Sequence, residues 1–260
     1  MEWKYLLYEE REGIGIITIN RPDKLNALNK ELLGELRGLI EGVKSNGQIK
    51  VVILTGSGEK AFAAGADIGE IAELGLTNAF AFSRDLQQVT NEIEDLGKPV
   101  IGGINGLALG GGFELALACH LRIFSENAKM GLPEVGLGAI PGMGGTQRLP
   151  RIIGKTRALW TILTGEMIDA ESGLRMGLAN KVVPPANLME ACLEVARTLL
   201  KKGPLAVSLA LQAVNSGLEM GQTEGLTLES TLMTIACASE DKSEGIKAFL
   251  EKRKPSFKGR

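Results

Sequence analysis

The alternation of apolar and polar positions along the chain predicts a layered α/β protein. Two β-branched runs at 4–9 and 13–20 flank a charged turn, and they predict a hairpin. Val51–Thr55 is a continuous apolar run typical of a strand covered on both faces, and similar strands are predicted at 99–104 and 120–125. Between these strands we expect helices, over 29–45 with Asn29 as its cap, over 77–96 and over 109–118. Strands that alternate with helices indicate crossover connections.

Beyond Pro150 the pattern becomes mainly helical, with a last short strand at Val182–Val183. Helices are expected over 155–163, 169–176, 186–202, 204–216, 221–238 and 241–252. We therefore divide the chain into an α/β core over 1–200 and a helical C-terminal region over 201–260. The amphipathic segment Leu226–Ala238 contains few charged residues. This favours an oligomer in which the region packs on a neighbouring subunit.

Charge and composition narrow the classes of partner. The net charge is −2, the pI is about 5.7 and aromatic residues make up only 4%, which argues against a nucleic-acid partner. No run reaches the roughly 18 apolar residues that a membrane span needs, and the N-terminus lacks a basic stretch followed by an apolar one. The three cysteines, Cys119, Cys192 and Cys237, lie far apart in apolar text, so we expect buried, reduced thiols and a cytoplasmic location.

Elimination leaves carboxylates as the acid/base candidates. His120 is the only histidine, which excludes a two-histidine zinc helix, and on an apolar strand we expect it to be a structural core residue. The chain has no G-x-S-x-G elbow and no G-x-x-x-x-G-K-[ST] phosphate loop. Its glycine runs also do not fit the G-x-G-x-x-G pattern of dinucleotide-binding folds.

Two glutamates stand alone among apolar residues and glycines. Glu114 is the only charge between Lys98 and Arg122, and Glu134 follows Pro133 in a second glycine-rich stretch. Burial would raise the pKa of each carboxyl group, as a general acid or base near neutral pH requires. Taken singly, Glu114 could instead brace a loop, and Glu134 could be stabilised in the first turn of a helix.

The 34 glycines cluster at 102–112 and 131–145, where they indicate close backbone approach to another element or to a ligand. Gly110–Gly112 precede a helix that we expect to start near Phe113, so their N–H groups would lack intrahelical acceptors. Such groups stabilise developing negative charge, as in an oxyanion hole. The small residues of the loop Ala61–Asp67 leave backbone amides equally open. Tight turns or helix packing remain alternative explanations for both loops.

Several of these segments together resemble the enoyl-CoA hydratase (crotonase) family. The resemblance covers nearly the whole chain and is carried by five segments in the family's order, Arg21–Leu28, Ala61–Ile68, Asn105–Glu114, Pro133–Pro150 and Phe249–Lys254. It implies a spiral of ββα units, a helical C-terminal trimerisation region, and a trimer or a hexamer built from two trimers. The one departure is Leu132, where some members have a polar residue that would alter the hydrogen bonding of Glu134.

The same resemblance assigns roles to individual residues. It implies that Glu114 and Glu134 are the catalytic pair and that the amides of Ala66 and Gly111 form the oxyanion hole. Gly142 would help to hold the catalytic water. Coenzyme A would run along Lys24, Leu25, Ala64, Ala66, Asp67, Ile68 and Gly111, with Lys252 as a further candidate for its phosphates.

The resemblance therefore predicts a hydro-lyase that adds water reversibly to a trans-2-enoyl-CoA, giving a 3-hydroxyacyl-CoA in fatty-acid or short-chain acid metabolism. Possession of both glutamates favours a hydratase over most related activities. No metal or redox cofactor is expected, because coenzyme A is part of the substrate. The alternatives are an enoyl-CoA isomerase or another acyl-CoA enzyme of the family and, in a different class, an RNA-binding homologue.

Overall fold

The larger sheet begins with the predicted hairpin. The computed structural model describes residues 3–72 and 74–260, apart from the side chain of Ile68. The strand order is β1-β2-β3-β5-β7-β10, with bounds β1 Leu6–Arg11, β2 Ile14–Ile19, β3 Val51–Gly56, β5 Val100–Ile104, β7 Leu121–Ser125 and β10 Lys181–Val183. β1 and β2 pair antiparallel, and the other neighbours pair parallel. The predicted hairpin, the buried strands and the late short strand are all confirmed.

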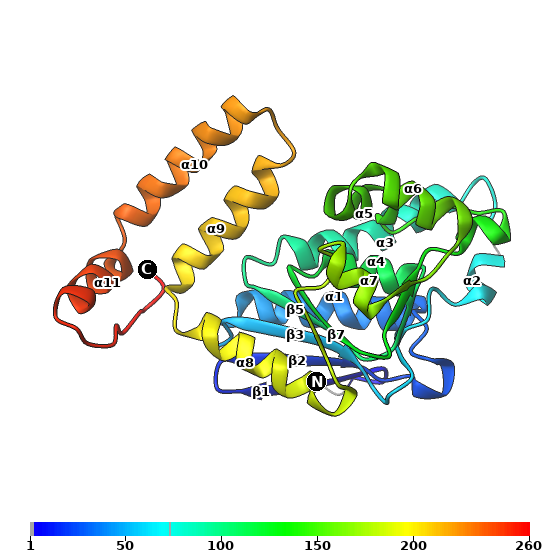
Figure 1. Ribbon diagram of the computed structural model, residues 1–260, viewed down its shortest axis with the longest axis horizontal. Helices are drawn as coiled ribbons and strands as arrows, with labels where there is room; N and C mark the ends of the chain where they lie inside the picture. The colour runs from blue at the N-terminus through cyan, green and yellow to red at the C-terminus, as the bar shows by residue number, and fades with distance from the viewer. Residues whose placement is uncertain (1–2, 73) are drawn as a thin grey trace.

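Both faces of β3 are buried, which explains its continuous apolar sequence. Val52 and Leu54 pack on the side of α1 (Lys30–Ser45) and α3 (Ala79–Glu94). Val51 and Ile53 pack on the opposite side, against α8 (Leu188–Leu200) (Figure 1). Successive side chains of a strand point to opposite faces, so an apolar residue is needed at every position.

A second, smaller sheet has the order β4-β6-β8-β9, with bounds β4 Ala61–Ala63, β6 Leu107–Leu109, β8 Lys129–Gly131 and β9 Ile168–Asp169. The first strand of each consecutive pair β3/β4, β5/β6 and β7/β8 joins the larger sheet and the second joins the smaller one. Helices follow each pair, so the chain winds as a spiral of ββα units. The predicted spiral is thereby confirmed.

The sequence prediction was wrong at the short elements around these strands. Residues 61–67 were expected as a loop, yet Ala61–Ala63 form β4. The helix expected over 109–118 begins at Gly111 as α4 (Gly111–Ala118), because Leu109 belongs to β6. The expected start near Phe113 was also wrong, since Gly111 and Gly112 already lie in the helix and only Gly110 precedes it. A three-residue strand shows no measurable alternation, and the helices α2 (Ile68–Ala72) and α5 (Gly145–Ile153) were also missed. Pro150 lies within α5, and a proline in the sequence usually indicates the end of a helix.

The remaining helices lie close to their predicted positions. The predicted cap is confirmed, because Asn29 Oδ1 accepts a hydrogen bond from Leu32 N at 3.0 Å at the start of α1. The other bounds are η1 Pro22–Lys24, η2 Glu134–Leu137, α6 Lys155–Thr164, α7 Ala170–Arg175, η3 Pro185–Asn187, α9 Pro204–Gly217, α10 Gln222–Cys237 and α11 Glu240–Leu250.

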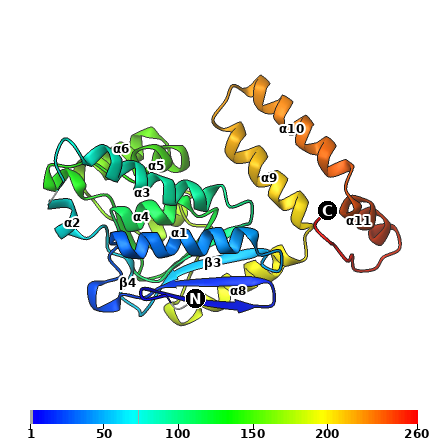
Figure 2. The ribbon, with the colours of Figure 1, turned by 180° about the vertical axis from the view of Figure 1, so that it is seen from behind.

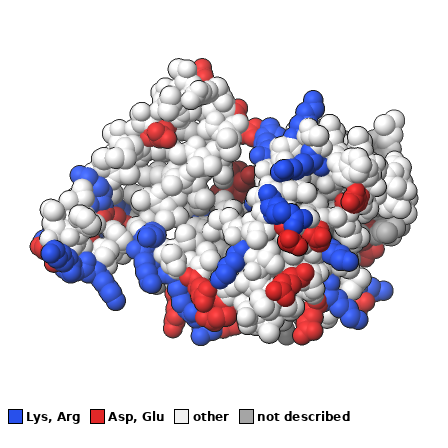
Figure 3. Space-filling model, viewed as in Figure 1, with Lys and Arg blue, Asp and Glu red and all other residues white. Residues whose placement is uncertain are grey.

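Helices α9, α10 and α11 form an arm that extends away from the two sheets (Figures 1 and 2). Its visible face along α9 and α10 is nearly free of charged side chains (Figure 3). The arm as a whole exposes large apolar residues, among them Leu218, Leu226, Met233, Ile235 and Phe249. The expectation of three buried thiols was wrong for one of them. Cys119 and Cys192 are buried in the core, but Cys237 at the end of α10 is exposed, because the arm has no apolar layer of its own to cover it.

Among the described residues, no helix combines the length and the apolar character that crossing a lipid bilayer requires.

Candidate active site

Glu114 is almost completely buried within the first turn of α4, with 2% of its surface exposed. The N–H groups of Met143 and Gly145 donate to its Oε1 at 2.8 and 2.6 Å. Burial raises the pKa of Glu114 to about 7, although the hydrogen bonds from the two backbone N–H groups act in the opposite direction and lower this pKa. This carboxyl group is therefore poised to gain or lose a proton near neutral pH.

Glu134 approaches the same place from the small turn η2. A Cβ atom built on Gly110, the residue before α4, would lie 2.9 Å from Glu134 Oε1. Burial raises the pKa of Glu134, and its Oε2 atom is buried without a hydrogen-bond partner among the described residues. The charge of Glu134 also raises the pKa of Glu114, so the two carboxyl groups interact. The structure thus brings both predicted glutamates to one site.

Two backbone amides, those of Gly111 and Ala66, lie close together at the start of α4. Gly111 is the first helical residue, so its N–H has no intrahelical acceptor. A Cβ atom on Gly111 would lie 3.6 Å from the amide nitrogen of Ala66. Ala66 forms a parallel bridge with Leu28 in which the Gly65 carbonyl accepts from Leu28 N and the Asp67 N–H donates to Leu28 O, both at 2.8 Å. This pairing leaves the Ala66 N–H to point away from Leu28.

The segment 142–145 is held from outside by α3. Ser83 Oγ donates to the carbonyl oxygen of Gly142 at 2.7 Å, and Gln87 Nε2 donates to the same oxygen at 3.3 Å. Sequence reasoning singled out Gly142 but missed Met143 and Gly145, whose amides contact Glu114. Main-chain donors carry no residue signature, and the glycine cluster was the one signal that pointed to this segment.

The departure at Leu132 has a structural counterpart. Its side chain is fully buried, and a Cβ atom on Gly145 would lie 3.1 Å from Leu132 Cδ1. Leu132 therefore supplies an apolar wall to the site and offers no donor to Glu134. This agrees with the partnerless Oε2 atom of Glu134.

Most of the residues predicted to bind coenzyme A lie along one edge of this site. Lys24 ends η1 with its side chain exposed, and the carbonyl of Leu25 accepts from Ala64 N at 3.0 Å. Asp67 pairs with Arg21 at 3.6 Å and accepts a hydrogen bond from Gly69 N at 3.2 Å, so it caps the turn that leads into α2. The side chain of Ile68 lies outside the described residues.

Lys252 is the exception among these predicted residues. It follows α11, at the end of the molecule opposite to α2 and η1 (Figures 1 and 2). Within one chain, the structure does not bring Lys252 to the other candidates.

The lone histidine has a structural environment, as expected. His120 Nδ1 accepts from Val100 N at 3.0 Å, and Nε2 lies 3.0 Å from the carbonyl oxygen of Glu94. Burial lowers the pKa of His120, which favours the neutral ring. Both ring nitrogens are thus satisfied by the backbone.

Glu114→Gln is expected to make the protein more stable than wild type above neutral pH. The folded-state pKa of about 7 lies above the ordinary value of 4.5, so the stability associated with protonated Glu114 is lost as pH rises from 4.5 through 7. Glutamine keeps an acceptor for the two N–H groups and carries no charge. Chemical denaturation should show the variant gaining about 3 kcal/mol on wild type between about pH 4 and pH 8. A stability difference that does not change with pH would contradict this burial cost.

Comparison with known proteins adds an independent line of evidence. Residues 9–260 match the family model described as enoyl-CoA hydratase/isomerase. The chain is 42% identical over 257 residues to a crotonyl-CoA hydratase of Syntrophomonas wolfei, with 99% of each chain covered. It is 43% identical over 261 residues to a short-chain-enoyl-CoA hydratase of Clostridium acetobutylicum, with all of both chains covered. A crystal structure of an enoyl-CoA hydratase from Bacillus anthracis is 40% identical and superposes with a TM-score of 0.95, covering 99% of this chain and 100% of that one. The chain therefore belongs to the enoyl-CoA hydratase/isomerase family.

Proposed function

We propose that this protein adds water reversibly across the double bond of a trans-2-enoyl-CoA to form a 3-hydroxyacyl-CoA. The observation that carries the proposal is the meeting of two carboxyl groups, both with raised pKa, beside the amide-bearing start of α4. Hydration needs one group to take a proton from water and another to give a proton to carbon, and this site offers one of each.

The backbone amides would bind the thioester oxygen. In the proposed complex this oxygen lies between the N–H groups of Ala66 and Gly111, which stabilise the negative charge that collects there as water attacks. Loss of one such donor typically costs about 3 kcal/mol in the transition state. The α4 terminus supports the same charge through its dipole.

The surroundings of the two glutamates assign the base and the acid. Two N–H donors at one oxygen of Glu114 favour its carboxylate, so Glu114 acts as the base and takes a proton from water while the oxygen attacks Cβ. Two ionised carboxyl groups at this site would repel each other, so only one of them readily carries a charge. Glu134 Oε2 has no donor among the described residues, so Glu134 is assigned the proton. Glu134 then gives its proton to Cα. The reaction adds one water molecule overall. The proton that Glu114 took from water then passes to Glu134, which restores both groups to their starting states.

The substrate is inferred from the residues proposed to bind coenzyme A and from the names of two related proteins. Lys24, Leu25, Ala64, Asp67 and Ile68 are proposed to bind coenzyme A at the exposed edge of the site, and Gly142 to help position the water. The names of the two relatives support a short acyl chain and a place in fatty-acid or short-chain acid metabolism. The reaction is redox-neutral and its proton transfers use carboxyl groups, so the proposal calls for no metal or redox cofactor.

The assembly is proposed to be a trimer or a dimer of trimers formed through the region 201–260. The exposed apolar residues along α9–α11 support this, because isolated chains rarely leave so much apolar surface in water. A contact between Lys252 and coenzyme A would then come from a neighbouring subunit.

Incubation with crotonyl-CoA tests the proposed activity. Ultraviolet absorbance of the enoyl thioester should fall, and mass spectrometry should find a product heavier by one water. A product of unchanged mass with a shifted double bond would indicate the isomerase instead. Absence of both changes with short-chain enoyl-CoA substrates would refute the proposal.

A further inference from the structure

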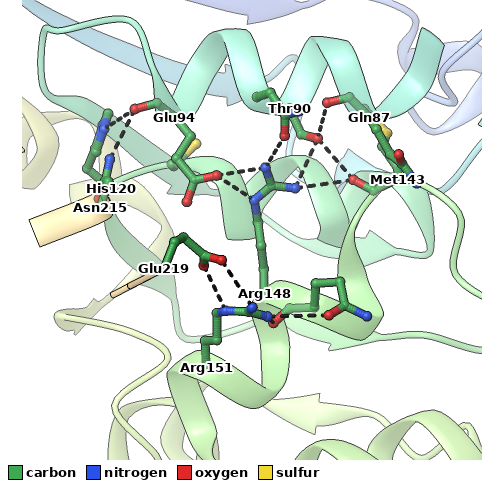
Figure 4. Close-up of polar contacts among 12 residues, drawn as sticks. Gln87, Thr90, Glu94, His120, Met143, Arg148, Arg151, Asn215 and Glu219 are labelled. Atoms are coloured by element: carbon green, nitrogen blue, oxygen red, sulfur yellow. Dashed lines mark hydrogen bonds and ion pairs between the residues drawn. The ribbon is translucent and has the colours of Figure 1, made fainter. Parts of the chain in front are cut away.

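Arg148 on α5 lies outside the site, next to the segment that contacts Glu114. Its side chain is only 12% exposed, although it borders a cavity of about 570 Å³ between α3, α5 and α9. Figure 4 shows the side chain reaching from α5 toward α3, between Glu94 and Met143. A largely covered guanidinium group is stable only where hydrogen-bond acceptors and negative charge surround it.

Within residues 3–72 and 74–260, the acceptors around the guanidinium group of Arg148 all lie on α3 or on the segment 142–145. Nε and Nη2 donate to Glu94 Oε2 at 2.9 and 2.7 Å, and Nη2 also donates to Asn91 Oδ1 at 2.7 Å. Nη1 donates to Thr90 Oγ1 at 3.0 Å and to the carbonyl oxygen of Met143 at 3.4 Å. The group therefore joins α3 to the backbone of Met143.

Thr90 supplies a second link to the same carbonyl group. Its Oγ1 atom lies 3.0 Å from the Met143 oxygen and 2.9 Å from the Gln87 oxygen, so its one hydroxyl hydrogen can reach either. Thr90 is completely buried, and the contact between α3 and Met143 is closed to solvent. The peptide group before the one that contains this carbonyl carries the Met143 N–H, and the peptide group after it carries the Gly145 N–H. Both N–H groups donate to Glu114.

Gly144 leaves room for the guanidinium group of Arg148. It has a φ of +111°, which L side chains rarely adopt, and a Cβ atom there would lie 2.2 Å from Arg148 Nη1. Any other residue would both strain this turn and displace the guanidinium group. The turn thus allows the arginine to reach the Met143 carbonyl.

Resting on the proposed function, we infer that Arg148, together with Thr90, is a positioning residue that keeps the amides of Met143 and Gly145 aimed at the carboxylate of Glu114. The charged groups that act on Glu114 are Glu134 from η2 and Arg148 from α5, and Arg148 is itself paired with Glu94 from α3. The positive charge of Arg148 lowers the pKa of Glu114 and so supports its role as the base.

Arg148→Met and Thr90→Val test the inference, with Arg151→Met as the control. Arg151 lies on the same helix but is exposed and pairs with Glu219, just beyond α9, at 3.0 Å (Figure 4). Arg148→Met should raise the pKa of Glu114, measured in the free protein from the carboxyl carbon shift by NMR. The acidic limb of the kcat/KM profile should move upward with it. Both test variants should lower kcat about tenfold or more with KM nearly unchanged, since small displacements of a catalytic group are costly.

A purely structural role would lower the melting temperature without these changes. The inference is overturned if Arg148→Met and Thr90→Val match Arg151→Met in kcat and in the pKa of Glu114. Thr90→Val keeps the size of the buried side chain and decides the matter if Arg148→Met does not fold. Failure of the wild-type protein to hydrate crotonyl-CoA would refute the proposed function alone, because the NMR titration of the free protein needs no substrate.

Discussion

Glu134→Gln should lower kcat by about 10²–10⁴-fold, the usual contribution of a general acid, while KM for crotonyl-CoA stays near the wild-type value. Glutamine has the size of glutamate but no proton to give to Cα. The carboxyl group of Glu134 lies at the start of α4, and its Oε2 has no hydrogen-bond partner in the part of the chain that the structure describes. The substitution therefore removes no hydrogen bond of that atom. We therefore expect an unaltered fold.

Steady-state kinetics on the purified variant measure this effect, and Glu126→Gln is the matched control. Glu126 is an exposed glutamate in the turn between β7 and β8, and its substitution should leave kcat unchanged. Wild-type turnover by Glu134→Gln would remove Glu134 from the mechanism. A rise in KM without a fall in kcat would make it a binding residue.

Gly112→Ala should prevent folding or destabilise the protein by about 3 kcal/mol or more, at the upper end of what overpacking costs. A Cβ atom on Gly112 would lie 1.9 Å from the carbonyl oxygen of Ala63. That oxygen belongs to β4 and is backbone, so relief requires α4 and β4 to separate. Since α4 carries Gly111 and Glu114, and the chain after β4 carries Ala66, activity should be lost with the fold.

Denaturant unfolding of Gly34→Ala provides the control for this substitution. Gly34 lies on α1, and a Cβ atom there would meet no other atom within 4 Å. Alanine at this position should stabilise the protein by about 0.5–1 kcal/mol, through the higher helix propensity of alanine. Equal stability of the two alanine variants would contradict the close packing of α4 on β4.

The parts of the fold that the sequence predicts are those with long, regular patterns. The hairpin, the buried run of β3 and the Asn29 cap each rest on several consecutive residues or on one side chain with a defined role. The strands β4, β6 and β8 have three residues each, too few for an alternation to appear. These strands nevertheless decide where Ala66, Glu114 and Glu134 meet, because each precedes one of them.

The site was predictable to the extent that side chains define it. Glu114 and Glu134 stand out as isolated charges in apolar text, and each alone could have been structural. The donors to Glu114 are backbone groups of Met143 and Gly145, which no residue type reveals. Arg148 resembles a surface arginine in the sequence, and its burial appears only when α3 and α5 pack together.

The most direct test asks whether both carboxyl groups act on one water molecule and one substrate. It compares kcat/KM of the double variant Glu114→Gln/Glu134→Gln with kcat/KM of the two single variants. Residues that work as a unit give non-additive losses, so the double variant should be nearly as active as the slower single variant. Losses in kcat/KM that multiply would mean that the two groups act independently, and the account of a shared site would be wrong.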